Sequence, residues 1–341
     1  MHNLQLTDDQ EMVVDTVKKF VVDSVAPKAQ ELDEHRTFVR DWCDALAELG
    51  VYGLSLAEDK GGAGMGLVPF VAALEAVGEH SGSLARLWIG QMQAVMALES
   101  VGGDLLDELA AGSKLAAFIG AEHGFTFADG RLTGSAAFVP AALEADVLIV
   151  VAGDAVVQVD ASACTRTATT GLGLNSAACG RVECDGVGAT ELAGADAHKA
   201  ELVALVGTAA AAVGAGVGSV RVGRNHAAER IAFGKPLLAQ QAVQRKLVES
   251  TRRVEAARQL TWHAARLADL GGDAADAAAH ARITAVDAAV QASDEAIQIL
   301  GGYGYTVEYH AERHYRDAKT FEVLDGGSNA LRDRLAAKAF V

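Results

Sequence analysis

The order of hydrophobic patterns along the chain is its strongest constraint on the fold. Helical spacing of apolar residues covers the first hundred or so of the 341 residues, as in Val13, Val17 and Val21. From about Leu115 to Gly194 the pattern changes to short apolar runs separated by turn dipeptides. Long Ala-rich helical patterns then return. Because strands and helices do not alternate, the order excludes a Rossmann sheet and a TIM barrel and predicts a mainly α protein with a small β domain.

These changes divide the chain into three expected domains. An N-terminal helical domain covers residues 1–114, a middle β domain of barrel or sandwich type covers 115–197, and a C-terminal four-helix bundle covers 198–341. Pro236 and Gly271-Gly272 separate helices of the last domain. The helices expected there cover about 199–229, 237–270, 272–300 and a final stretch from about 326.

The N-terminal domain opens with a capping box, Thr7-Asp8-Asp9-Gln10, whose acids also suit the positive end of a helix dipole. This signature predicts a helix over about 7–25, which Pro27 ends. Apolar periodicity predicts further helices over about 68–78 and 84–101. The first domain is therefore expected to be all-helical.

Charge and cysteine content exclude several classes of function. With 29 lysines and arginines against 45 acids, the net charge of −16 repels nucleic-acid phosphates and anionic membrane surfaces. The N-terminus lacks the basic and apolar segments of a secretory signal peptide. Neither a metal site nor a disulfide framework is expected, since no CxxC or histidine-cluster spacing occurs. We expect a cytoplasmic protein whose thiols are reduced. Its cysteines are Cys43, Cys164, Cys179 and Cys184.

One stretch calls for a comparison with membrane spans. Leu202 to Val220 runs for 19 residues without a charge, which is within the length range of a transmembrane helix. Its residues are mostly Ala and Gly, which are weakly apolar, and no aromatic belt flanks it. We therefore expect a buried helix and no membrane span, with small residues that let neighbouring helices approach closely.

Two segments of the last domain carry a more specific signal. The first, over 229–241, reads ERIAFGKPLLAQQ; the second, over 296–305, reads AIQILGGYGY and is followed by RHYRDAK at 313–319. In order and spacing they resemble signatures of the acyl-CoA dehydrogenase family, and the resemblance extends over the whole chain. It implies FAD-dependent α,β-dehydrogenation of an acyl-CoA thioester, a tetramer, and an electron acceptor such as an electron-transfer flavoprotein.

The resemblance also implies contacts to FAD, which lies at a dimer interface in the family. The family's Arg in the RxxFGKP motif contacts the flavin pyrophosphate of the neighbouring subunit, a role that falls to Arg230, whose planar fork suits phosphate. Phe233 would pack on the cofactor and Gln241 would hydrogen-bond it. The adenosine-side contacts match Gln298 and the backbone of Leu300, Gly301 and Gly302.

Each assignment has a structural alternative. Arg230 could be a surface arginine that pairs with Glu229 or with an acid elsewhere, and Gly301-Gly302 could be a helix C-cap. Arg316 and Asp317 are expected to be a structural pair rather than part of a site.

The catalytic base departs from the family pattern. Most members use a Glu followed by Gly-Thr, and the aligned stretch here places Asp325 in that position, with one methylene less of reach. Other members place the base on the first helix of the last domain, at about Ala204, where this chain offers no carboxylate. A helix N-cap ahead of Gly326 is the structural alternative for Asp325.

The middle domain departs further. In the family, a Gly-Ser-Asp loop and a later Trp-Ile-Thr/Ser stretch hold the flavin ring. Here the Gly-Ser-Asp part is missing after Gly120–Gly124, Phe138 replaces the Trp, and Pro140 replaces the hydroxyl residue. Because proline has no N–H, the donors expected near the flavin ring are lost.

This asymmetry resembles one subunit of the heterotetrameric α2β2 acyl-CoA dehydrogenases, several of which act on CoA thioesters of steroid side chains. We therefore expect a chain that works with a second, homologous chain, in fatty acid or steroid catabolism. The lost Trp and the shortened loop are expected to widen the acyl pocket for a bulky ring system. Two alternatives stay open: a self-sufficient homotetramer with Asp325 as base, and a non-catalytic structural subunit.

Overall fold

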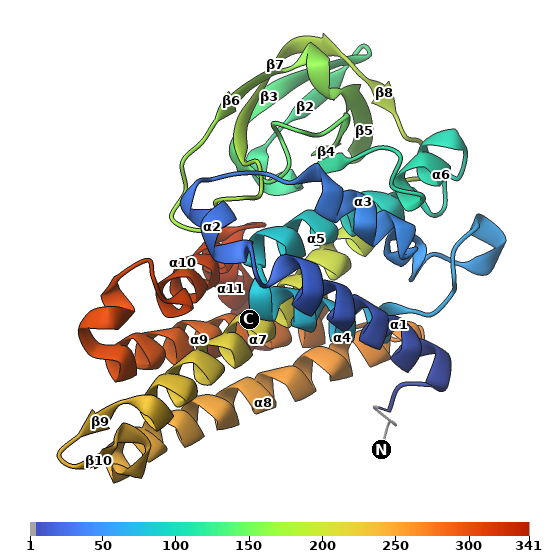
Figure 1. The fold of residues 1–341 in the computed structure, drawn as a ribbon. Helices are drawn as coiled ribbons and strands as arrows, with labels where there is room; N and C mark the ends of the chain where they lie inside the picture. The colour runs from blue at the N-terminus through green and yellow to red at the C-terminus, as the bar shows by residue number, and fades with distance from the viewer. Residues whose placement is uncertain (1–4, 341) are drawn as a thin grey trace.

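The computed structural model describes residues 5–340 and consists of an N-terminal helical layer, a β domain and a long helical bundle (Figure 1). The predicted capping box is confirmed: Gln10 N donates to Thr7 Oγ1 at 3.3 Å, and Thr7 N donates to Gln10 Oε1 at 3.1 Å. The first helix continues as a π-helical segment, Val21–Val25, just before Pro27. The N-terminal helices are α1 Asp8–Phe20, α2 Ala29–Glu34, α3 Arg40–Glu48, α4 Leu67–His80, α5 Gly82–Leu98 and α6 Asp104–Ala110.

The β domain contains two four-stranded sheets with the orders β1-β4-β5-β8 and β2-β3-β7-β6. Strands β1 and β4 pair in parallel, and the remaining neighbours pair antiparallel. Leu132 and Val182 from one sheet and Leu148 and Val157 from the other belong to one hydrophobic cluster, which joins the sheets. The strands are β1 Ala116–Ile119, β2 Thr126–Ala128, β3 Arg131–Val139, β4 Val147–Ala152, β5 Ala155–Asp160, β6 Thr165–Ala168, β7 Gly180–Gly188 and β8 Thr190–Glu191.

The C-terminal part is helical, which confirms the predicted fold class. The sequence prediction missed one helix, α10, because its segment HAERHYRDAKTFEV is rich in charged residues and lacks a broad apolar stripe. Between α7 and α8 a short hairpin, β9 Ile231–Ala232 and β10 Lys235–Pro236, projects from the end of the bundle (Figure 1). The helices are α7 Ala197–Glu229, α8 Gln241–Asp269, α9 Ala275–Leu300, α10 His310–Val323 and α11 Gly327–Phe340.

Helix α7 is the central core helix. It is long and apolar enough to cross a membrane, but 89% of its most apolar window is buried inside the protein. Glycines let α4 approach it closely: a Cβ on Gly214 would lie 2.1 Å from the Glu75 carbonyl oxygen, and one on Gly78 would lie 2.5 Å from the Ala211 oxygen. The small residues of this helix therefore serve close helix packing, as the sequence predicts.

A buried charged cluster joins the three parts of the chain. Arg316 Nη2 on α10 donates to Asp33 Oδ2 on α2 at 2.5 Å, and Leu174 N of the β domain donates to Asp317 Oδ1 at 2.7 Å. The Asp33 side chain is 3% exposed. Arg316 and Asp317 are thus structural, but they do not pair with each other as predicted; successive helical residues point in different directions, and each side chain binds a different domain.

His80 on α4 and His310 and His314 on α10 lie close together, and their burial predicts that the folded state loses stability in acid. Burial, assisted by Arg313 and Arg221, lowers the pKa of His80 and of His310 to about 4. Their unfolded pKa lies near 6.5, so the unfolded chain binds more protons between pH 4 and 6.5 and stability falls as the pH drops through that window. We expect His310→Gln to make this loss of stability shallower than in the wild type, measured as the free energy of unfolding against pH. Replacing the exposed His280 by Gln is the control; equal slopes for His310→Gln and the wild type would contradict the prediction.

Candidate active site

Asp325 lies in the loop between α10 and α11, in a backbone conformation that side chains rarely adopt. Its φ is +49°, and the next two residues, Gly326 and Gly327, have φ of +78° and +79°. Left-handed backbone is strained for a non-glycine residue and persists only where the surroundings hold it. The turn ends α10 sharply and directs the Asp325 side chain toward the interior.

Two buried arginines hold Asp325. Arg86 Nη2 on α5 donates to Asp325 Oδ1 at 2.8 Å, and its Nη1 donates to Gln93 Oε1 at 3.0 Å. Arg282 on α9 donates to the Asp325 carbonyl oxygen at 3.4 Å and to carbonyls at the end of α10. Burial lowers the pKa of Arg282, and the nearby Asp325 opposes that shift. The carboxylate is therefore positioned through both its backbone and its side chain.

The second carboxylate oxygen of Asp325 is free. Within the described part of the chain, Oδ2 is buried and has no hydrogen-bond partner, while Oδ1 bonds to Arg86. The N-cap interpretation of Asp325 is wrong: among the described residues Oδ1 accepts from Arg86 of another domain and Oδ2 has no partner, so neither oxygen binds an N–H of α11. A carboxylate with one anchored oxygen and one free acceptor has the arrangement that a general base requires.

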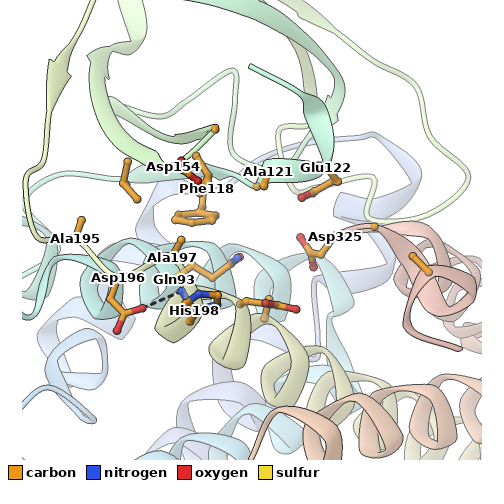
Figure 2. Close-up of a pocket in the computed structure, with 18 of the residues that line it drawn as sticks. Gln93, Phe118, Ala121, Glu122, Asp154, Ala195, Asp196, Ala197, His198 and Asp325 are labelled. Carbon is orange, nitrogen blue, oxygen red and sulfur yellow. Dashed lines mark hydrogen bonds between the residues drawn. The ribbon is translucent and has the colours of Figure 1, made fainter. Parts of the chain in front are cut away.

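Asp325 lies between two cavities. The larger, of about 710 Å³, and the smaller, of about 450 Å³, are both lined by Phe118, Glu122, Asp325 and Gly326. Figure 2 shows the side chains of Glu122 and Asp325 opposite each other across the larger cavity, with Phe118 beside them and Gln93 below Phe118. The larger cavity is enclosed by the β domain, the start of α7 and the start of α11. Many of the residues that line it are small, among them Gly120, Ala121, Gly153, Ala195, Ala204 and Ala330.

The rest of the larger cavity is polar at its edges. Glu201 on α7 pairs with Arg334 on α11, and Asp154 lines the wall near β5. Asp196 Oδ1 accepts from His198 N at 2.9 Å and so caps α7, as the dashed line in Figure 2 marks. Ala204 lines the cavity too, which places the family's other base position in the same space without a carboxylate.

Sequence reasoning missed Arg86, Arg282 and Glu122 as site residues. A signal existed for Arg86, since it is the one charge inside the apolar segment GSLARLWIG, and a charge that is 2% exposed needs a partner. No local signal links it to Asp325, which lies 239 residues away. Among residues 5–340 no group of metal-ligating side chains occurs.

The smaller cavity is where this chain's own flavin ring would be expected, and its residues do not fit that group well. Its β-domain wall is Ala137, Phe138, Val139 and Pro140. Proline offers no N–H, and the Phe138 ring packs closely against Gly171. The ionisable groups present are Arg86, already bound to Asp325, the carboxylates of Glu122 and Asp325, and His123, whose Nε2 lies 3.4 Å from Glu122 Oε1. Hydrogen-bond donors for a flavin ring are therefore poorly supplied by this wall.

The other predicted flavin contacts lie at the far end of the bundle (Figure 1). Arg230 ends α7 and is exposed, and no ion pair with Glu229 is found among the described residues. Phe233 and Gly234 form the tip of the hairpin with φ of +53° and +76°, as a type I′ turn requires. The Phe233 side chain is 95% exposed. An exposed large apolar side chain on a residue in the left-handed region is typical of a site that binds a ligand or another protein.

The remaining predicted contacts share this end. Gln241 begins α8, and Gln298 lies in the last turn of α9; both side chains are exposed. Gly301 and Gly302 follow with nothing within 4 Å of an added Cβ, which leaves open space for a ligand, whereas Leu300 is buried and offers only its backbone. Gly301 also ends α9, so the C-cap interpretation holds as well. A small cluster of Ala227, Leu247 and Ile299 with Leu237 and Val243 fixes the helix ends together. The exposed side chains and the open space at the glycines leave this end of the bundle accessible to a ligand.

Known proteins resemble this chain over its full length. Family models for the acyl-CoA dehydrogenase N-terminal and C-terminal domains match residues 7–107 and 204–340. The "Probable acyl-CoA dehydrogenase YngJ" of Bacillus subtilis (strain 168) is 30% identical, with 97% of each chain covered.

Solved structures show the same fold. Butyryl-CoA dehydrogenase from Megasphaera elsdenii superposes with a TM-score of 0.90 at 24% identity and 99% coverage of both chains. A glutaryl-CoA dehydrogenase from Mycobacterium smegmatis in complex with FADH2 gives 0.87 at 22% identity, covering 98% of this chain and 96% of its own. The chain therefore belongs to the acyl-CoA dehydrogenase family of FAD-dependent oxidoreductases, which dehydrogenate acyl-CoA thioesters.

Proposed function

We propose that this chain is one subunit of a hetero-oligomeric acyl-CoA dehydrogenase, and that it completes the FAD site of a second, homologous chain. The observation that carries the proposal is a difference between the two parts of the expected flavin site: the residues for a neighbour's FAD are present, whereas those for this chain's own flavin ring are not. Arg230, Gln241 and Gln298 are exposed at one end of the bundle, whereas the side chains of the wall formed by Phe138 and Pro140 offer no hydrogen-bond donor. A chain of this kind gives contacts to a neighbour's cofactor without building a complete ring site of its own.

When FAD is bound with the help of the second chain, it would supply the hydride acceptor. Asp325 Oδ2 accepts the α-proton of the acyl group, since it is the free oxygen of a carboxylate that borders both cavities. Arg86 keeps Oδ1 occupied and so fixes the direction of Oδ2. The electrons would pass on to an acceptor such as an electron-transfer flavoprotein.

We further propose a bulky, steroid-type acyl group and a cytoplasmic enzyme. The cavity of about 710 Å³ lies within the range of ligand sites for drug-sized molecules, and its small lining residues leave room for a rigid ring system. A self-sufficient homotetramer is the second candidate, because Asp325, with one unpartnered carboxylate oxygen, lines the larger cavity within this one chain.

Arg230 tests the proposal directly. We expect Arg230→Ala, introduced only into this chain of the purified hetero-oligomer, to weaken FAD binding by about 10- to 100-fold, the value of charge-assisted hydrogen bonds to phosphate. The measurement is FAD affinity by titration of the deflavinated complex. The matched control is Arg224→Ala, an exposed arginine on the same helix. Unchanged FAD affinity in Arg230→Ala would contradict the role proposed for this chain.

A further inference from the structure

Two cysteines of the β domain face each other at short range. Cys184 lies on β7, and Cys164 immediately precedes β6; the registered pair Thr165 and Glu183 places the two cysteines directly opposite on neighbouring antiparallel strands. Their sulfur atoms are 2.9 Å apart. A disulfide bond is about 2.05 Å long, and directly opposed residues on antiparallel strands lie within the Cα separation that a disulfide spans. The two sulfur atoms need to approach by less than 1 Å to bond.

The two thiols differ in reactivity. The hydrogen bond between the two thiols lowers the pKa of Cys164, with help from Arg166, and raises the pKa of Cys184. The thiolate is the nucleophile in thiol oxidation, so Cys164 reacts first. It follows the short turn Ala161–Ala163, whose residues Ser162 and Ala163 are exposed, so a small oxidant approaches from that side.

The other two cysteines provide a contrast. Burial raises the pKa of Cys43 and of Cys179 to about 12. Among the described residues, neither of their sulfur atoms bonds to a second thiol. Buried thiols of high pKa are inert. Oxidation would therefore select one pair out of four cysteines.

We propose that Cys164 and Cys184 form an oxidation site, which hydrogen peroxide converts into an intrachain disulfide. The Cys164 thiolate attacks one peroxide oxygen, giving a sulfenic acid and hydroxide. The Cys184 sulfur then attacks the Cys164 sulfur and displaces the hydroxyl group, which leaves as water with the Cys184 proton. In sum two thiols lose two electrons and two protons to the peroxide, which is reduced to two molecules of water.

The disulfide would link the two strands, β6 and β7, whose connecting segment contacts α10. Between β6 and β7, Gly173 N donates to Thr320 Oγ1 at 3.1 Å and Leu174 N donates to Asp317 Oδ1 at 2.7 Å. Helix α10 ends beside Asp325. The disulfide therefore constrains a connection that reaches from the β domain to the helix preceding the proposed base, independently of which subunit arrangement the enzyme adopts.

The test uses the full-length chain, purified reduced and treated with hydrogen peroxide. We expect the count of thiols titrated after denaturation to fall from four to two, with a mass loss of two hydrogens mapped to the peptides of Cys164 and Cys184. In Cys184→Ser, Cys164 should stop at the sulfenic acid and be trapped by dimedone; Cys179→Ser should still form the bond. The proposal is overturned if native wild-type protein keeps all four thiols, or if the bond joins other cysteines.

Discussion

Replacing Asp325 by Asn is expected to lower the turnover of the assembled enzyme by about 10²- to 10⁴-fold, the range supplied by a positioned general base. The amide keeps the size of the side chain and can still accept from Arg86, but it cannot take a proton at the position of Oδ2. The loss should fall on kcat, because the proton is transferred in the transition state and not in substrate binding. Steady-state turnover with a saturating acyl-CoA measures it.

A matched carboxylate controls for the charge change. Asp154→Asn removes a carboxylate from the wall of the same cavity without touching the loop between α10 and α11. We expect its kcat to stay close to that of the wild type. Unchanged turnover in Asp325→Asn would instead support the non-catalytic structural subunit.

The largest stability effect is expected at Arg316. Arg316→Ala should lower the free energy of unfolding by about 3–5 kcal/mol, because it leaves Asp33 buried at 3% side-chain exposure without its opposite charge. Because Asp33 Oδ1 has no hydrogen-bond partner in the described chain, the buried carboxylate depends more strongly on its ion pair with Arg316. Chemical denaturation of wild type and variant measures the difference.

Two further variants separate charge burial from general damage. Arg332→Ala removes an exposed pair with Asp287, and surface pairs contribute about 0–1 kcal/mol. Combining Asp33→Ala with Arg316→Ala should recover part of the loss, since the Asp33 carboxylate is then no longer buried without its partner. If Arg316→Ala costs no more than Arg332→Ala, the buried cluster does not join the domains as described.

The sequence predicts the architecture well where the signal is local. The capping box at Thr7 and the continuous apolar run 147–152 each specify their element without help from distant residues. Helix α10 was missed because tertiary contacts stabilise it: Arg313, His314 and Asp317 are buried against other domains although they are polar. Periodicity cannot find a helix whose buried face is charged.

The candidate site was predictable only in part. Motifs identify Asp325 and the bundle-end residues, because glycine and arginine spacing is a local property. The partners of Asp325 are set by the fold, since Arg86 and Arg282 come from helices far away in the chain. Only the folded chain makes clear that one oxygen of Asp325 is anchored and the other free.

The most direct test of the account is the amount of FAD that this chain retains when it is purified alone and when it is co-purified with a homologous chain. We predict little FAD and no turnover for the chain alone, and stoichiometric FAD with acyl-CoA dehydrogenation for the pair. Stoichiometric FAD and full turnover in the chain alone would contradict the proposed division of the flavin site.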